Sequence, residues 1–461
     1  MKKKIIDYEK LDKKYLWHPF TQMKAWIECS QTVIERAKGV YLYDTNGTKY
    51  LDGVSSLWAN IHGHSHPTIV NAIKRQLGKL DHSTMLGLTN VPAILFAKKL
   101  VDLTPNNLTR VFYSDDGATA VEIALKMSFQ YWKLKGKKYA KKKKFVSFSN
   151  SYHGDTLGSV SVGGVAMFHE VFKPLLFRTI KVSYPSCYRC PLKEEPHLCE
   201  IDQLKEIESV FKAHHQEICG VVVEPMIQGA AGMVPMPKGF LKNLEKLTKQ
   251  FGIHLILDEV ATAFGRTGKM FALDHEKIRP DFLALAKGIT GGTLPLAATL
   301  TTVEIFQSFL GEYEEFKSFF HGHTYTGNPI ACSAALANLE IFQKENTLYK
   351  LQGKIHLLKT LLKSFKNLSH VGDVRQLGFM VGIELVFNRS SKKPFPVVQR
   401  IGHQVVLEAH RRGVILRPLG DTIVLMPPLS ITSTQLRKLV KTTYDSIHTI
   451  TQEQKPQRNS I

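Results

Sequence analysis

The chain has 461 residues, of which 43% are hydrophobic, and 61 Lys and Arg against 40 Asp and Glu give it a net charge of +21. This is enough apolar material for a large core, and we expect one large domain with a smaller one. No apolar run reaches the roughly 18 residues of a membrane span. The basic start at 1–10 is not followed by the apolar stretch of a secretory signal, so we expect a cytoplasmic protein with no membrane partner.

The positive charge comes mostly from Lys residues spread along the chain, and the densest run lies at 133–144. No aromatic RNA-binding motif and no zinc-finger spacing accompanies this run. We interpret it as a solvated helix end and loop, and we expect no nucleic-acid partner. A basic surface can still attract anionic metabolites.

Strands and helices alternate through the middle of the chain. Apolar, β-branched runs are typical of strands buried on both faces, and they stand at 110–114, 144–149, 219–224, 254–259 and 282–287. After the first run, residues 117–136 carry apolar and small side chains on one stripe, as in an amphipathic helix. The alternation predicts a doubly wound α/β fold with a mostly parallel sheet.

After Pro329 the pattern changes. Two long helices are expected at 331–342 and 354–365, followed by short strands at 379–385, 414–418 and 422–428. We therefore predict a large domain at 66–328 and a smaller C-terminal α+β domain at 329–461. The N-terminal segment, 1–65, is expected to contribute to the small domain and the active site.

Six cysteines occur in the chain, and without a secretory signal we expect them to be reduced thiols. Cys187, Cys190 and Cys199 form a C-x₂-C pair with a third Cys nine residues on, and His197 could supply a fourth ligand to Zn²⁺ or an iron–sulfur cluster. Because the motif is incomplete, we favour the interpretation that no metal is bound.

Two predicted strand ends carry the residues of greatest chemical interest. One run ends on Asp258 and Glu259, and the next ends on Lys287, 29 residues after Asp258. Ligands of open α/β sheets bind beyond the carboxyl ends of the strands, so Asp258 and Lys287 should face one crevice. Pyridoxal phosphate needs this layout, with a Lys in a Schiff base to its aldehyde and an Asp beside its pyridinium nitrogen. The alternatives are an Mg²⁺-holding Asp-Glu pair and a Lys that only caps the sheet.

Four further segments could complete such a site. Gly117 and Ala118 begin the predicted helix, and a helix N-terminus binds phosphate readily. Tyr152 could stack on a flat ring, and Arg417 could bind a carboxylate in bidentate fashion. The turn-rich segment 321–329 could close a phosphate cradle with a Thr hydroxyl. An ordinary turn, a packing Tyr and a surface ion pair remain the simpler alternatives.

These roles define a mechanism. Lys287 would act as general base and acid for a 1,3-proton shift, and Asp258 would keep the ring nitrogen protonated. Two half reactions would follow each other, which predicts ping-pong kinetics.

With these residues in place, the chain resembles the class III, fold-type I aminotransferases over nearly its full length. The runs "LILDEVATAFGRTG" and "LALAKGITGG" are the family's signature. The segments "LWHPFTQM" and "YHGDT", with Asp155, and the presence of Ala261 resemble the branch that forms 7,8-diaminononanoate in biotin synthesis.

The resemblance implies roles for the cofactor-binding residues. Lys287 would bear pyridoxal phosphate, Asp258 would pair with its ring nitrogen, and Tyr152 would stack on the ring. The phosphate would be held by Gly117 and Ala118, joined by His323 and Thr324 from the neighbouring subunit of a homodimer.

The resemblance also implies a substrate pocket. Arg417 would take the carboxylate of 8-amino-7-oxononanoate, and the other lining residues would be Phe20, Leu57, Trp58, Tyr152 and Gly322. Several positions depart from the family pattern, namely Phe20, Leu57, Ala118, His323 and Val424. Most of them cluster where the amino donor would lie, so S-adenosylmethionine, the usual donor, and lysine both remain open. A related ω-amino acid:pyruvate transaminase, a nucleic-acid-binding protein and a catalytically silent member of the fold are the alternative functions.

Overall fold

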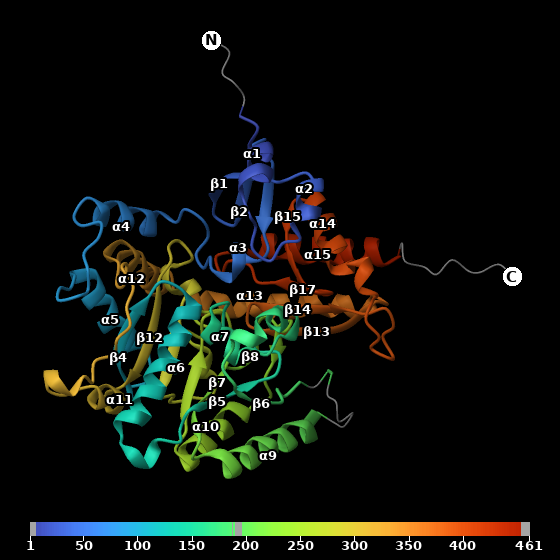
Figure 1. Cartoon of the computed structure of the whole chain (residues 1–461). Coiled ribbons are helices and arrows are strands. Elements are labelled where there is room, and N and C mark those ends of the chain that lie inside the picture. Colours follow the sequence, from blue (N-terminus) through green and yellow to red (C-terminus); the bar gives the residue numbers. More distant parts are fainter. Residues whose placement is uncertain (1–5, 187, 190–195, 453–461) are drawn as a thin grey trace.

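A seven-stranded sheet forms the centre of the computed structural model, which describes residues 6–186, 188–189 and 196–452 (Figure 1). Its order is β4-β12-β11-β10-β7-β5-β6, and β12 alone runs antiparallel to its neighbours. The strands are β4 (Leu108–Ser114), β5 (Lys144–Phe148), β6 (Ile180–Val182), β7 (Ile218–Val223), β10 (His254–Asp258), β11 (Phe282–Leu285) and β12 (Ala297–Thr302). The predicted α/β fold with a mostly parallel sheet is confirmed.

Helices cover both faces of this sheet. The α-helices of the described chain are α1 (Tyr8–Tyr15), α2 (Met23–Glu28), α3 (Ser55–Trp58), α4 (Pro67–Leu77), α5 (Val91–Leu103), α6 (Gly117–Leu134), α7 (Leu157–Val162), α8 (Ala166–His169), α9 (Pro196–His214), α10 (Phe240–Phe251), α11 (Val303–Ser308), α12 (Pro329–Lys344), α13 (Thr347–Leu362), α14 (Ile401–Arg411) and α15 (Ser433–Gln452). In β10, Leu255 and Leu257 pack into one core and Ile256 into the other, where α6 lies. This double burial explains the unbroken apolar run, because each such side chain contributes about 2 kcal/mol when removed from water.

Helix α6 forms where the sequence predicts it. The Asp116 side chain accepts a hydrogen bond from the Thr119 N–H and caps the helix, which starts directly after β4. The stripe of Val121, Ala124, Leu125 and Ser128 is buried against the sheet. The N-terminus of α6 therefore points its free N–H groups toward the carboxyl edge of the sheet.

One part of the basic run is not solvated, contrary to our interpretation. Lys142 is 5% exposed, and its Nζ donates to the carbonyl oxygens of His215, Ile218 and Gly252 at 2.7–2.9 Å. The Nζ also lies 4.2 Å from the ring centre of Trp132. Three carbonyl acceptors and an aromatic face together offset the loss of hydration, so this Lys holds strand and helix ends together.

Two four-stranded sheets and a short ribbon complete the fold. One sheet has the order β1-β2-β3-β15 and the other β13-β14-β17-β16, while β8 pairs with β9. Their strands are β1 (Ile34–Lys38), β2 (Tyr41–Asp44), β3 (Lys49–Asp52), β8 (Ile227–Gln228), β9 (Val234–Pro235), β13 (Val371–Leu377), β14 (Met380–Leu385), β15 (Val414–Ile415), β16 (Arg417–Leu419) and β17 (Thr422–Leu425). The predicted strand at 414–418 is thus divided between two sheets.

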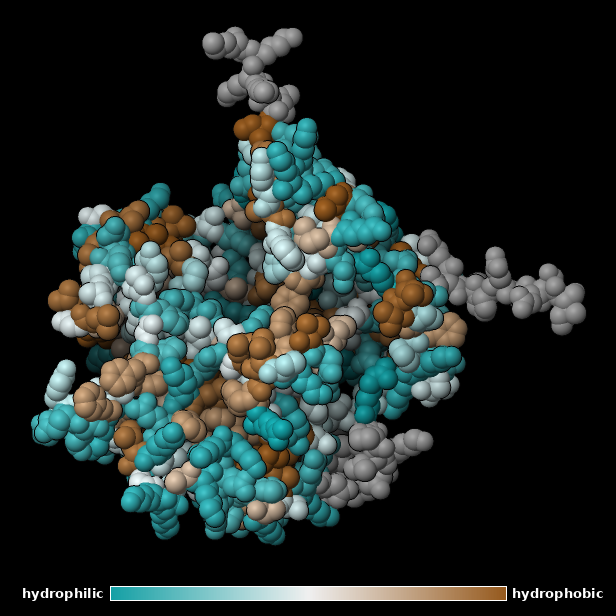
Figure 2. All heavy atoms as spheres, in the orientation of Figure 1, coloured by the Kyte–Doolittle hydropathy of each residue, from teal (hydrophilic) through white to brown (hydrophobic). Residues whose placement is uncertain are grey.

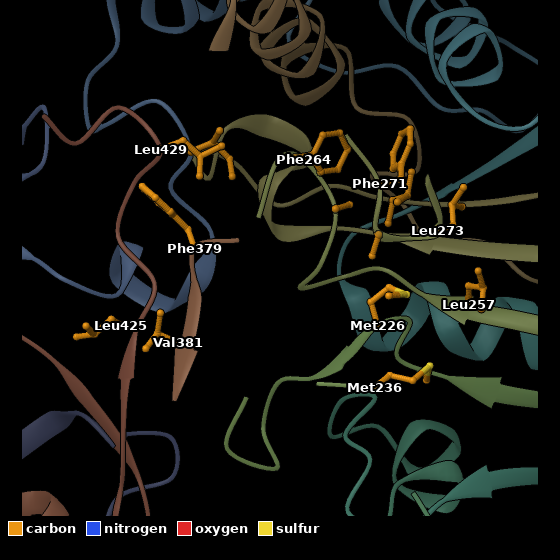
Figure 3. Close-up of a cluster of buried hydrophobic side chains, with 14 of the residues drawn as sticks. Met226, Met236, Leu257, Phe264, Phe271, Leu273, Phe379, Val381, Leu425 and Leu429 are labelled. Carbon is orange, nitrogen blue, oxygen red and sulfur yellow. The ribbon is translucent and has the colours of Figure 1, made fainter. Parts of the chain in front are cut away.

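The N-terminal strands lie beside the C-terminal part of the chain, blue next to red in Figure 1. Strand β3 pairs in parallel with β15, with Leu51 opposite Val414. Figure 3 shows Phe379 and Leu429 from the C-terminal part in one hydrophobic cluster with Phe264 and Leu257 from the large-sheet part. These parts share a core, and the boundaries at 65/66 and 328/329 stay predictions.

Candidate active site

A cavity of about 750 Å³ lies where the parallel strands end. Its lining includes residues just past four strands, namely Asp115 after β4, Tyr152 after β5, Glu224 after β7 and Lys287 after β11, together with Asp258 at the end of β10. Ligands bind at this edge in open α/β sheets. The structure therefore brings Asp258 and Lys287 into one cavity.

Asp258 is 4% exposed and is held in place from two sides. One carboxylate oxygen accepts the N–H of Val260 at 3.0 Å, and the other lies 2.7 Å from His153 Nδ1. His153 is itself 3% exposed, and its Nε2 has no hydrogen-bond partner among the described residues. The carboxylate is consequently fixed in orientation while it still faces the cavity.

Lys287 begins a short 3₁₀ turn, Lys287–Thr290, two residues after β11 ends. Its ammonium makes no hydrogen bond within the described part of the chain, and its Nζ lies 5.9 Å from the ring centre of Trp58. Burial lowers the pKa of Lys287, while the nearby charges of Asp258, Glu224 and Asp155 oppose this effect. A lowered pKa raises the fraction of neutral amine, which is the nucleophilic and basic form.

The N-terminus of α6 forms one wall of the cavity, with Gly117 and Ala118 among the lining residues. A Cβ on Gly117 would come within 2.5 Å of the Val260 side chain, and one on Gly154 within 2.3 Å of the Ala118 Cβ. Two glycines are needed for this close approach of backbone segments. The free N–H groups and the dipole of α6 make this wall suited to a phosphate.

Tyr152 lines the cavity beside Asp155, and its hydroxyl donates to Asp155 Oδ2 at 2.7 Å. Its backbone N–H donates to Glu224 Oε1 at 3.1 Å. Burial is the main cause of a raised pKa of Tyr152, which the charge of Arg417 partly opposes. The phenol therefore stays protonated and donates to Asp155 at neutral pH.

Glu224 is a buried carboxylate whose second oxygen accepts the N–H of Gly229 at 2.9 Å. Burial raises its pKa to about 7, and the nearby His153 opposes this shift. Sequence reasoning did not name Glu224 or His153 as site residues. The sequence contained features that could have identified both residues. Glu224 ends a predicted strand, as Asp258 does, and His153 directly follows Tyr152.

Of the predicted pocket residues in the N-terminal segment, only Trp58 lines the cavity. Trp58 lines the cavity and is 7% exposed, whereas Leu57 is 48% exposed and is not among the lining residues. Phe20 lines an adjoining hollow of about 570 Å³. The ring of Phe168 connects the two hollows, since its centre lies 5.3 Å from that of Phe20 and 6.2 Å from that of Tyr152.

The remaining predicted residues do not line the cavity of the described chain. Arg417 is partly buried on β16, opposite Val424 on β17, which packs with Trp58 in one hydrophobic cluster. The segment that carries Gly322, His323 and Thr324 runs along α6, where His323 Nδ1 lies 2.9 Å from Asp115 Oδ2. It therefore reaches the edge of the cavity, since Asp115 is a lining residue.

Cys187, Cys190 and the side chains of His197 and Cys199 lie outside the described residues. Within residues 6–186, 188–189 and 203–452, no group of three or more His, Cys, Asp and Glu side chains is arranged to hold a metal ion. In the same part of the chain, no helix combines the length and apolar character needed to cross a bilayer.

Comparisons with known proteins agree on one family. The family model "Aminotransferase class-III" matches residues 23–447. An adenosylmethionine-8-amino-7-oxononanoate aminotransferase of Aquifex aeolicus is 55% identical over 94% of this chain and 95% of its own length. The crystal structure of the enzyme of that name from Methanocaldococcus jannaschii has a TM-score of 0.91 at 50% identity, covering 95% of this chain and 98% of its own. The omega transaminase from Pseudomonas jessenii in complex with PMP has a TM-score of 0.93 at 28% identity, covering 97% of this chain and 99% of its own.

Proposed function

The chain belongs to the class-III aminotransferase family, and we propose that it transfers an amino group to 8-amino-7-oxononanoate to form 7,8-diaminononanoate, a step of biotin biosynthesis. The observation that carries the transferase chemistry is a cavity in which the unpaired Lys287 lies across from the fixed carboxylate of Asp258. The acceptor is supported by relatives of 47–55% identity that share the name given above.

The residues of the cavity fit pyridoxal phosphate, the cofactor of this family. The cofactor needs an amine for its aldehyde, a carboxylate for its ring nitrogen and donors for its phosphate. Lys287 offers an amine without a hydrogen-bond partner in the described chain, Asp258 offers the carboxylate, and the start of α6 at Gly117 and Ala118 offers backbone N–H groups. When bound, the cofactor supplies an electron sink for the carbon that loses a proton.

The protein's own residues position and move the protons. Asp258 would hold a proton at the ring nitrogen, and its bond to His153 keeps the carboxylate from rotating away. Lys287 Nζ would take the proton from the substrate carbon and return it to the carbon on the far side of the shared nitrogen, which completes the 1,3-proton shift, and its lowered pKa helps this task. Trp58 and Tyr152 add ring surface to the lining of the cavity in which this transfer would take place.

Recognition of the acceptor is assigned to groups around Tyr152. Asp155 presents a carboxylate to the cavity, which suits the acceptor's amino group, and Arg417 is charged and close enough to Tyr152 to influence its pKa. We assign Arg417 to the substrate carboxylate, with Phe20, Leu57 and Trp58 beside the aliphatic chain. Replacing Arg417 with Met should raise the KM for the keto acid about 100-fold, and an unchanged KM would contradict this role.

S-adenosylmethionine is the donor named for the relatives, and lysine is the alternative. A half-reaction experiment separates them. The cofactor-loaded protein is mixed with each donor alone, and loss of the absorbance band of the Lys287-bound cofactor is followed in a stopped-flow spectrometer. Conversion by S-adenosylmethionine supports the named donor, whereas conversion by lysine alone replaces it.

A second candidate is an ω-amino acid:pyruvate transaminase, because the omega transaminase fold superimposes with a TM-score of 0.93. The two functions differ in their substrates. Robust turnover of β-alanine or 4-aminobutyrate with pyruvate, and none with 8-amino-7-oxononanoate, would favour this candidate and overturn the first.

We also propose a homodimer in the cytoplasm, with each site completed by the other subunit. Figure 2 shows apolar side chains gathered over α4 and α5. Leu86, Leu88 and Val91 are 87%, 63% and 66% exposed there, and exposed apolar patches mark protein interfaces. His323 and Thr324 would then come from the second copy to the phosphate end of the cavity, with Gly322 lining the substrate pocket. Light scattering of the purified protein tests this, since a monomeric mass at micromolar concentration would contradict it.

A further inference from the structure

A buried arginine outside the cavity connects three distant segments of the chain. Arg266 is 1% exposed, and its Nη1 donates to Pro427 O at 2.8 Å. Its Nη2 donates to Asn60 O at 2.7 Å and to Trp58 O at 3.3 Å. Among the described residues no carboxylate lies within ion-pair distance of Arg266, although the charge of Asp52 acts on it from further away, and its hydrogen bonds go to main-chain carbonyl groups. Burying such a charge is costly and needs these partners.

The segment bound by Arg266 includes α3, which is a strained loop rather than a regular helix because its backbone leaves helical geometry at Ser56 and Leu57. Ser55, Ser56 and Trp58 all have left-handed backbone conformations, with φ of 52°, 60° and 64°. Residues with a Cβ rarely adopt this region, and persist there only where the surroundings hold them. Asp52 holds the start of the loop through the N–H and hydroxyl of Ser56, and Arg266 holds its end.

This loop packs directly on the turn that follows Lys287. The N–H of Ile61 donates to Gly291 O at 3.1 Å. A Cβ on Gly292 would come within 2.4–2.5 Å of the backbone of Ala59 and Asn60, so only glycine permits the contact. The loop that carries Trp58 and the turn that follows Lys287 are therefore coupled through direct backbone contact.

The other segment bound by Arg266 continues from the strand beside Arg417. Pro427 follows β17, and β17 pairs with β16 so that Val424 lies opposite Arg417. The Ser55 hydroxyl adds a second link to this segment, since it donates to Met426 O at 2.7 Å. Arg266 thus joins the Lys287 side of the cavity to the strand pair that carries Arg417.

We propose that Arg266 is a positioning residue that sets the separation between Arg417 and Lys287, and thereby the length of the keto acid that reacts. The inference rests on the proposed function, in which Arg417 binds the carboxylate and the reacting carbon lies at Lys287. Two fixed ends select one chain length, because a homologue with fewer or more methylene groups places its ketone away from the amine.

The experiment compares kcat/KM for the nine-carbon amino keto acid with its homologues that are two methylene groups shorter and longer. The Arg266→Lys variant keeps the charge but cannot reach all three carbonyl groups. It should reduce the preference for the nine-carbon acid about tenfold, mainly through KM, while the protein still binds its cofactor. Ser55→Ala, which removes the second link, should reduce the preference in the same direction by a smaller factor.

Lys142→Met is the matched control, because Lys142 is also a buried cation held by main-chain carbonyl groups but lies outside the cavity lining. It should destabilise the protein and leave the chain-length preference unchanged. A wild-type preference in both Arg266→Lys and Ser55→Ala would overturn the inference. If the wild type instead uses ω-amino acids with pyruvate, the proposed function fails, and the same ratio over an ω-amino acid series still tests Arg266.

Discussion

Lys142 and Lys287 both lie at strand ends, the first buried and the second half-buried, and the hydrogen bonding of their ammonium groups differs. The Lys142 ammonium donates to three carbonyl oxygens and lies on the Trp132 ring. Lys287 has no hydrogen-bond partner in the described chain. Burial lowers the pKa of both, in Lys142 to about 8. A buried amine whose donors are all used is structural, whereas one whose donors are free is available for chemistry.

The backbone at Lys287 also has an unusual conformation. Lys287 itself has φ of 45°, in the left-handed region, and is followed by Gly291 and Gly292 at positive φ. Strain of this kind is characteristic of functional sites, where neighbouring structure holds an unfavourable conformation. Removing each lysine should therefore affect different properties of the protein.

The largest effect is expected at Lys287. Lys287→Ala should lower kcat roughly 10⁴-fold or more and abolish the absorbance band of the covalently held cofactor, because no other amine lines the described part of the cavity. Steady-state kinetics and absorption spectra measure both. Residual turnover above one-hundredth of the wild type would contradict the role of Lys287.

The second-largest loss of kcat is expected on replacing Asp258. Asp258→Asn keeps the shape but loses the charge that holds a proton at the ring nitrogen, and kcat should fall about 10³-fold. The bond to His153 gives a comparison: His153→Gln keeps the carboxylate but weakens the bond that orients it, and kcat should fall about tenfold. Equal losses in the two variants, measured at saturating substrate, would show that the pair acts as a single unit.

Replacing Lys142 should affect the stability of the protein and not its activity. Lys142→Met should lower the free energy of unfolding by about 2 kcal/mol, because three buried carbonyl groups lose their donor. Activity of the folded protein should stay within about twofold of the wild type. Urea unfolding and kinetics on the same samples measure the two quantities, and a large loss of kcat without a loss of stability would reverse the assignment.

Replacing Glu224 should have a small effect on stability, and this effect should depend on pH. Its pKa rises from 4.5 to about 7 on folding, mainly through burial. The folded state therefore binds more protons than the unfolded state between these values, and its stability falls as pH rises through this window. Glu224→Gln cannot lose a proton, so the variant should gain stability relative to the wild type from about pH 5 to about pH 8. Parallel unfolding curves measure this difference, and a constant difference would contradict it.

The sequence predicted the elements that hold the chemistry. The runs ending at Asp258 and near Lys287 form strands because their side chains are buried on both faces, and this pattern is strong in a sequence. The helix at Gly117 was predictable from its apolar stripe and starts beside a capping Asp116. These features depend on local spacing, which the sequence displays directly.

Features that depend on distant partners were missed or stay open. Lys142 stands among exposed lysines, and only the carbonyl groups of His215, Ile218 and Gly252 distinguish it. Arg266 acts through Trp58 and Pro427, at opposite ends of the chain. The roles given to His323 and Thr324 depend on a second subunit, so they remain predictions.

The pairing of β3 with β15 has a consequence for biogenesis. The N-terminal strands leave the ribosome early, yet Leu51 finds its partner only when Val414 has been made. At roughly 5–20 residues per second, this interval lasts about 20–70 s. Throughout it, the edge of β3 is an unpaired template for other chains. We therefore expect nascent chains of this protein to depend on chaperones in proportion to the time that β3 stays uncovered, and faster translation of residues 53–413 to raise the soluble yield.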